Sequence, residues 1–181
     1  MKAVEQEIRF EAPVQTVGTQ IIVRLPAEAS AALPSRGQVS VTGTIAGQPF
    51  ETVVEPDGEK GHWLRIPKKL QRSAGVPEGN PVAFALEPTP DWPEPEIPAD
   101  LAEALAAASP KVAEKWREIT PMARWEWVRW VHATANPATR ATRIEKTISK
   151  LEGEHRRPCC FNLAACTDPE LSKSGKLVAP R

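Results

Sequence analysis

The residues best suited to chemistry lie in the C-terminal stretch EHRRPCCFNLAACTD, which holds all three cysteines of the chain and one of its three histidines. The side chains there that could bind zinc in a tetrahedral site are His155, Cys159, Cys160 and Cys166. Their spacing, His-x3-Cys-Cys-x5-Cys, differs from the paired Cys-x2–4-Cys knuckles of common zinc fingers. We therefore expect inert thiols and no cofactor here, and keep a zinc site and a redox-responsive thiol as the two alternatives.

A second group of candidate residues is basic and lies in the segment TRATRIEKTISK. At 100° per residue, one edge of a helix over this segment is basic, and the adjacent edge, with Ile144, Ile148 and Leu151, is apolar. Such an edge suits an acidic protein partner or a small anion, although a solvated helix face is the commoner case. The basic side chains on this edge are Arg140, Arg143, Lys146 and Lys150.

A third group lies in GHWLRIPKKLQRSAG, where a strand pattern gives way to a short helix. Basic side chains at such a crossover suit an anion or a nucleic acid, but residues 1–87 carry nine basic and ten acidic groups, a net charge of −1. We expect a solvent-facing cap, with Arg65 and Arg72 as candidate anion-binding residues and nucleic-acid binding as the alternative. The group consists of His62, Arg65, Lys68, Lys69 and Arg72.

Three further features suggest no functional role. The earlier crossover carries Glu28 and Arg36 but no matching basic cluster. The acidic residues of EPDGEKGH lie in an evident turn, where we expect them to set the geometry of the loop. His62 and His132 are far apart in the sequence, and neither has an apparent partner.

Common catalytic motifs are absent from the sequence, which has no Gly-rich phosphate loop and no HExxH, DxDxDG or GxSxG pattern. Charges balance at 23 basic and 23 acidic residues. No apolar run approaches the roughly 20 residues of a membrane span, and the N-terminal MKAVEQEIRFEAP lacks the apolar core of a signal peptide. We expect a non-catalytic protein of the cytoplasm, with a metal- or thiol-dependent enzyme as one alternative.

The pattern of residues 4–87 is that of short strands. QVSVTGTIAG alternates apolar and polar residues with strand period, and QPFETVVEP follows it after an Ala-Gly step that predicts a hairpin. Two stretches share one plan: Arg24-Leu25-Pro26 and Arg65-Ile66-Pro67 each end a strand and precede a short helix, a glycine and another strand. Unless this match is chance, the repeated unit predicts a small closed barrel capped by two helices.

The pattern changes to helical period after the proline-rich segment EPTPDWPEPEIP, which predicts a stiff extended linker. Three helix starts follow, each with a side-chain oxygen at the N-cap and proline at the first helical position. They are Ser109-Pro110, Thr120-Pro121 and Asn136-Pro137. Short connections and apolar stripes of helical period predict a bundle of about four helices.

Both halves of the sequence resemble known families. RFEAPVQ, IIVRLPAE and GQVSVTGTIAGQPFETVVEPDGEKGHWLRIPKKLQRSAGVPEGNPVAFALEP are similar to a small β-barrel domain of unknown function. IPADLAEALAA and WEWVRWVHATANPATRATRIEKTISKLEGE resemble the YdeI/OmpD-associated bacteriocin-protection family, through Trp130, Thr139-Arg140, Arg143-Ile144, Lys146 and Leu151-Glu152-Gly153. The resemblance implies a pseudobarrel of the double-split barrel type and no established enzyme activity. It adds Trp130 to the candidate binding residues, and it leaves the last 27 residues unmatched.

The sequence therefore predicts an α+β protein, with a six-to-seven-stranded closed pseudobarrel capped by short helices and followed by a small helical bundle. The expected boundaries are a barrel domain at 1–87, a Pro-rich linker at 88–98, a helical YdeI/OmpD-associated-like domain at 99–154 and a Cys-containing tail at 155–181. We expect a non-catalytic binding or stress-protection module whose partner is an unidentified protein or a small anionic ligand. A nucleic-acid-binding regulator shaped like swapped-hairpin proteins is the alternative. Because one chain supplies both halves of the predicted barrel, we expect a monomer.

Overall fold

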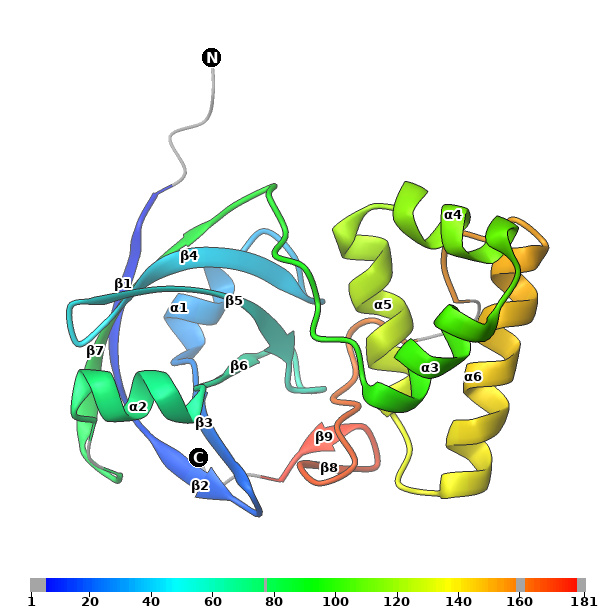
Figure 1. Ribbon diagram of the computed structural model, residues 1–181. Coiled ribbons are helices and arrows are strands. Elements are labelled where there is room, and N and C mark those ends of the chain that lie inside the picture. Colours follow the sequence, from blue (N-terminus) through cyan, green and yellow to red (C-terminus); the bar gives the residue numbers. More distant parts are fainter. Residues whose placement is uncertain (1–5, 77, 159–161, 179–181) are drawn as a thin grey trace. The chain divides into compact units, whose positions relative to one another are not determined.

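The computed structural model of the 181-residue chain describes residues 6–76, 78–158 and 162–178 (Figure 1). The chain divides into two compact units. A sheet unit comprises Met1–Pro93, Leu163–Cys166 and Glu170–Arg181, and a helical unit comprises Glu94–Asn162 and Thr167–Pro169. The sheet unit is therefore discontinuous in sequence, because the chain returns to it after the helices.

The sheet unit contains seven antiparallel strands in the order β1-β7-β4-β5-β6-β3-β2. Figure 1 shows that this sheet is strongly curled. The strands are β1 (Ile8–Pro13), β2 (Gln15–Val17), β3 (Gln20–Arg24), β4 (Val39–Ile45), β5 (Gln48–Pro56), β6 (His62–Arg65) and β7 (Pro81–Pro88). Two short helices, α1 (Ala27–Ala31) and α2 (Lys68–Ala74), occupy the two predicted crossovers.

The α+β class and the seven strands agree with the sequence prediction, but the closed barrel is not confirmed. The sheet is a curled half-barrel whose edges are β1 and β2, and the described residues contain no pairing between these two strands. Val14 alone separates these two strands in the chain. They are successive parts of one bent strand rather than neighbours that pair side by side.

The two Arg–aliphatic–Pro corners lie on the paired strands β3 and β6 and are related by a shift of 41 residues, which takes Arg24 to Arg65. Leu25 donates its N–H to the carbonyl of His62 at 3.0 Å, and Ile66 donates to that of Ile21 at 2.8 Å. The same shift takes Leu25 to Ile66 and Ile21 to His62, so each hydrogen bond is the counterpart of the other. This symmetry supports the predicted duplication.

The core of the sheet unit follows from strand alternation. In β7, Val82, Phe84 and Leu86 are buried, whereas the intervening Ala83 is exposed. The ring of Phe84 stacks on that of Phe10 from β1, with centroids 5.0 Å apart. Both short helices contribute apolar side chains to this core, Ala29 from α1 and Leu70 and Ala74 from α2.

The helical unit contains α3 (Ala99–Ala107), α4 (Pro110–Glu118), α5 (Pro121–His132) and α6 (Pro137–Glu152), which share one apolar core. The three predicted N-caps are confirmed. Ser109, Thr120 and Asn136 each accept a backbone N–H from three residues further on, at 3.4, 3.2 and 3.1 Å. Within the described residues, no helix combines the length and the apolar character that crossing a bilayer requires.

Candidate functional site

A cavity of about 500 Å³ lies in the sheet unit, between β1, the first crossover and the loop from β5 to β6. Its volume falls within the range of small-molecule sites. Part of its wall is apolar and consists of Ala12, Pro13, Leu25, Pro26, Ala27 and Ala31. The polar and charged residues of the wall are Glu11, Gln15, Arg24, Ser30, Arg36, Asp57, Glu59 and Lys60.

Asp57 organises the loop that forms one side of the cavity. Its Oδ1 accepts the N–H groups of Glu59 and Gly61 at 2.7 and 2.8 Å, and its Oδ2 accepts from Arg24 Nη1 at 3.1 Å. The prediction that the acidic residues of this turn set loop geometry is thereby confirmed for Asp57. The side chains of Arg24 and Asp57 are 15% and 7% exposed, so the ion pair is largely shielded from water. The sequence did not reveal that partner.

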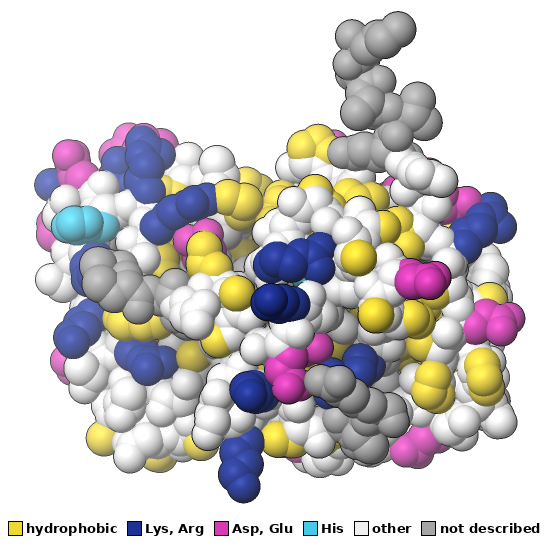
Figure 2. Space-filling model, turned by 180° about the vertical axis from the view of Figure 1, so that it is seen from behind, with side chains coloured by type: hydrophobic (Ala, Val, Ile, Leu, Met, Phe, Trp, Pro, Cys, Tyr) yellow, Lys and Arg dark blue, Asp and Glu magenta, His cyan; other side chains and the backbone are white. Residues whose placement is uncertain are grey.

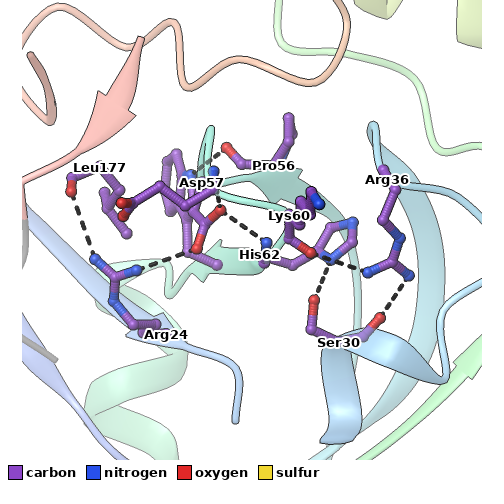
Figure 3. A network of polar contacts seen from close by, with 11 residues as sticks. Arg24, Ser30, Arg36, Pro56, Asp57, Lys60, His62 and Leu177 are labelled. Atoms are coloured by element: carbon purple, nitrogen blue, oxygen red, sulfur yellow. Dashed lines mark hydrogen bonds and ion pairs between the residues drawn. The ribbon is translucent and has the colours of Figure 1, made fainter. Parts of the chain in front are cut away.

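His62 of β6 is fully buried, and its ring contacts Ser30 of the cavity wall (Figure 3). Its Nε2 is 3.0 Å from the carbonyl oxygen of Gly37, and its Nδ1 is 2.5 Å from Ser30 Oγ. A carbonyl oxygen can only accept, so Nε2 carries the proton and Nδ1 accepts the Ser30 hydroxyl. Burial lowers the pKa of His62 below its usual value, which favours this neutral form.

Arg36 ties the end of α1 to the opposite wall. Its Nη2 donates to the carbonyls of Ser30 and Leu33 at 2.7 and 2.9 Å, and its Nη1 donates to the carbonyl of Lys60 at 3.0 Å (Figure 3). These carbonyls fix the guanidinium plane and satisfy carbonyl groups at the helix end. Among the described residues no carboxylate pairs with Arg36, so its positive charge is oriented but not cancelled.

Lys60 supplies a second positive charge at the same wall. Its backbone has a φ of 71°, in the left-handed region that non-glycine residues rarely adopt. The residue is exposed, and within the part of the chain that the structure describes its ammonium group forms no ion pair. Strained backbone of this kind is a reason to look for function at the loop.

Two family models match the chain. Residues 10–86 match a domain of unknown function (DUF1905), and residues 94–153 match the bacteriocin-protection, YdeI or OmpD-associated family. This chain joins a DUF1905 domain to a YdeI/OmpD-associated domain. No curated protein matches the chain. The whole cavity wall lies within the DUF1905 domain, and residues after 153 lie outside both family matches.

The second crossover of the DUF1905 domain carries the basic group that the sequence singled out. Arg65, Lys68, Lys69 and Arg72 are all exposed. The Arg65 guanidinium lies 5.3 Å from the centroid of the Trp63 ring, and its Nε donates to Gln20 Oε1 at 2.5 Å. Neither Arg65 nor Arg72 belongs to the cavity wall, so the structure does not bring these candidates to the cavity.

On the basic edge of α6 in the YdeI/OmpD-associated domain, Arg140 pairs with a carboxylate, whereas Arg143 contacts Trp130. Arg140 is held by Asp100 of α3, with Nε–Oδ2 at 2.6 Å and Nη2–Oδ1 at 3.0 Å. The hydrogen bonds from Arg140 hold the pKa of Asp100 below its usual value and raise that of Arg140. Arg143 donates to the carbonyl of Trp130 at 2.8 Å, with its guanidinium 5.5 Å from the Trp130 ring centroid.

Two of the candidate zinc ligands, Cys159 and Cys160, lie outside the described residues. The side chain of Cys166 is buried, 2% exposed, in an apolar cluster of the sheet unit. His155 is exposed just after α6. Among the residues that the structure describes, no three His, Cys, Asp or Glu side chains come together as metal ligands.

Proposed function

We propose that the DUF1905 domain of this chain binds a small molecule with an anionic group in the cavity at its first corner. The observation that supports this most is the pair of cations in the wall, Arg36 and Lys60, which no carboxylate of the described residues neutralises. Asp57 does not offset them, because its charge is already matched by Arg24. An oriented guanidinium at a concave site suits a carboxylate or a phosphate group.

The apolar and acidic residues of the cavity wall indicate which kind of anion would fit. Pro13, Pro26 and Ala31 offer apolar surface beside the two cations, which suits a ligand with an apolar part. Glu11 on β1 and Glu59 carry the opposite charge and would repel a multiply charged anion. We therefore expect a singly charged carboxylate with an apolar body, such as benzoate, to bind better than inorganic phosphate.

Calorimetric titration with benzoate tests this proposal. Lys60→Gln removes one wall cation that has no structural contact through its side chain, and it should weaken benzoate binding about threefold or more. Lys68→Gln, an exposed cation at the second crossover, is the matched control and should bind like the unmodified protein. Absence of benzoate and phosphate binding, or equal binding by both variants, would contradict the proposal.

The hydrogen bond from Ser30 to His62 also resembles a nucleophile with its base. Ser30 is 2% exposed, however, and the other ring nitrogen of His62 is fixed by a backbone carbonyl rather than a carboxylate. A buried imidazole needs a partner for each nitrogen, and these two contacts supply both. We therefore assign the pair a structural role, attaching α1 to β6.

A second candidate function concerns the YdeI/OmpD-associated domain. Arg143, Lys146 and Lys150 follow one edge of α6, and no carboxylate among the described residues pairs with them, unlike Arg140. We propose that this edge docks an acidic partner, a role compatible with a protective function. Lys146→Glu with Lys150→Glu should abolish binding of a hexaglutamate peptide and preserve folding, whereas Lys111→Glu on α4 should not affect it. Equal binding of the peptide by all variants would exclude this edge of α6 as the docking site.

A nucleic-acid-binding regulator is the alternative that these features support less. On the face that Figure 2 shows, Lys and Arg side chains lie scattered rather than gathered in one continuous patch. A regulator would dimerise and bind duplex DNA with a steep salt dependence. We propose a monomer instead, because the two related halves of the sheet belong to one chain. The mass in solution distinguishes the two.

A further inference from the structure

The C-terminal segment of the chain packs on the DUF1905 domain, although it lies outside the family match. We call residues 163–166 and 170–178 the clasp. It contains the short hairpin β8 (Ser172–Lys173) and β9 (Lys176–Leu177). Its Cys166, Leu171 and Leu177 are 2%, 0% and 5% exposed and form an apolar cluster with two residues of the sheet, Ile22 and Trp63.

One carboxylate anchors the clasp to the turn between β2 and β3. Glu170 accepts the N–H of Thr19, the Thr19 hydroxyl at 2.9 Å and the side-chain amide of Gln20 at 3.0 Å. The hydrogen bond from Gln20, followed by those from Thr19, holds the pKa of Glu170 below its usual value. The anchor is exposed, so solvent competes with it.

Three glycines of the DUF1905 domain lie where the clasp approaches most closely. A Cβ at Gly18 would lie 2.0 Å from Glu170 Oε1, and one at Gly58 would lie 1.9 Å from the carbonyl oxygen of Gly175. At Gly37 it would lie 3.2 Å from the carbonyl oxygen of Leu163. A side chain at Gly58 would displace the clasp backbone, whereas one at Gly18 would displace the Glu170 side chain and one at Gly37 would need a small shift of the clasp.

The clasp also touches the wall of the cavity. Leu177 donates its N–H to the carbonyl of Asp57 at 2.9 Å, and its own carbonyl lies 3.5 Å from Arg24 Nη2 (Figure 3). Trp63, which the clasp covers, donates its indole N–H to the carbonyl of Pro56 at 3.1 Å. The clasp therefore contacts the guanidinium of Arg24 and the backbone of Asp57, the two residues of the ion pair.

We propose that the clasp is a releasable element that holds the Arg24–Asp57 wall in place, so that its release loosens the loop from β5 to β6. Release needs less than global unfolding, because the seven strands are supplied by residues 8–88 without it. The coupling between the clasp and a ligand rests on the proposed function. A ligand that binds only the ordered wall stabilises the docked clasp, and release of the clasp speeds ligand exchange.

Thiol reactivity of Cys166 measures release directly. In full-length protein with Cys159→Ser and Cys160→Ser, Cys166 is the one remaining thiol, and a disulfide reagent such as DTNB reaches it when the clasp opens. Glu170→Ala should raise its reaction rate about tenfold. Glu78→Ala is the matched control, because Glu78 is exposed and its Oε1 accepts the N–H of Thr16 at 3.0 Å without touching the clasp.

Amide hydrogen exchange then tests the coupling to the cavity. In Glu170→Ala, exchange of the Gly61 and Leu177 amides should rise by about the same factor as Cys166 reactivity. The Ala46 amide in the β4–β5 hairpin, which donates to the carbonyl of Ala83 at 2.9 Å, is a control outside the clasp contacts and should not change. Equal Cys166 rates in Glu170→Ala and Glu78→Ala, or faster thiol reaction with unchanged Gly61 exchange, would overturn the inference.

Benzoate distinguishes this inference from the proposed function. If benzoate binds, it should slow the Cys166 reaction in proportion to cavity occupancy. Binding without any slowing would refute the link between clasp and ligand and leave the proposed function standing. If neither benzoate nor phosphate binds, the proposed function fails, whereas the thiol and exchange results still decide whether the clasp holds the wall.

Discussion

The two Arg–aliphatic–Pro corners of the DUF1905 domain share a backbone plan and differ in chemistry. At the first, Arg24 pairs with Asp57, and Ser30 bonds a buried histidine beside a cavity. The shift of 41 residues takes Arg24 to the exposed Arg65 and Ser30 to Gln71, and it places Ile21 where the first corner has His62. The buried ion pair and the serine–histidine hydrogen bond therefore lie at the first corner, beside the cavity, and we place the proposed binding site there.

The largest expected contrast is between the two arginines. Arg24→Ala should lower the free energy of unfolding by about 3 kcal/mol, because it strands the shielded carboxylate of Asp57. Arg65→Ala should cost less than about 1 kcal/mol, because its guanidinium is exposed and stacks on Trp63. Urea unfolding curves measure both. Similar costs would show that the corners do not differ in this way.

The hydroxyl at the first corner provides the next contrast. Ser30→Ala leaves Nδ1 of the fully buried His62 ring without its donor and should cost about 2 kcal/mol. Gln71→Ala, at the related position on α2, should change stability by no more than about 0.5 kcal/mol. The same unfolding experiment measures both, and a Ser30→Ala protein as stable as Gln71→Ala would contradict the assigned role.

The histidine makes the first corner sensitive to pH. Because burial places the folded-state pKa of His62 below its unfolded value of 6.5, the unfolded chain binds more protons as pH falls through that value. The free energy of unfolding should therefore fall between about pH 7.5 and about pH 5.5, by at most about 1.4 kcal/mol per pH unit. His62→Gln should flatten this dependence in thermal or urea unfolding, and an unchanged slope would rule out His62 as its source.

The smallest expected effect is on stability at Lys60, where a strained backbone and a proposed ligand contact belong to the same residue. Lys60→Gly should stabilise the domain by about 0.5–1 kcal/mol, because glycine accepts the φ of 71°, and it should also weaken benzoate binding. Ala46→Gly, at a φ of 47° in the β4–β5 hairpin, is the control that should stabilise without affecting binding. Thermal unfolding and titration of both variants test this. Unchanged benzoate affinity in Lys60→Gly would separate the strained loop from the ligand.

Much of the fold could be predicted from local signals. Proline after Arg24-Leu25 and Arg65-Ile66 marks both corners, and the cap at Ser109 with its following proline marks a helix start, because these depend on adjacent residues. Closure of the barrel is not confirmed, because the described residues show no pairing between the edge strands β1 and β2. Periodicity cannot decide that question.

The candidate site was harder to predict because its parts are distant in sequence. Ser30 and His62 are separated by 32 residues and meet through the pairing of β3 with β6. The sequence suggested no functional role for Arg36, because it is a lone cation whose importance lies in the carbonyls that surround it. The sequence favoured the second crossover, where basic residues are numerous, although the cavity lies at the first. The alignment of His62 with Ile21 was the available signal, since it breaks the repeat at a core position.

The most direct test of the account is the amide NMR spectrum of the unmodified protein titrated with benzoate. The account predicts that amides of Ala31, Lys60 and Gly61, in or beside the cavity wall, shift with a single saturating binding curve. Amides of Ser73 and Gly75 at the second crossover should remain in place. Shifts confined to the second crossover, or no saturable shift in the DUF1905 domain, would contradict it.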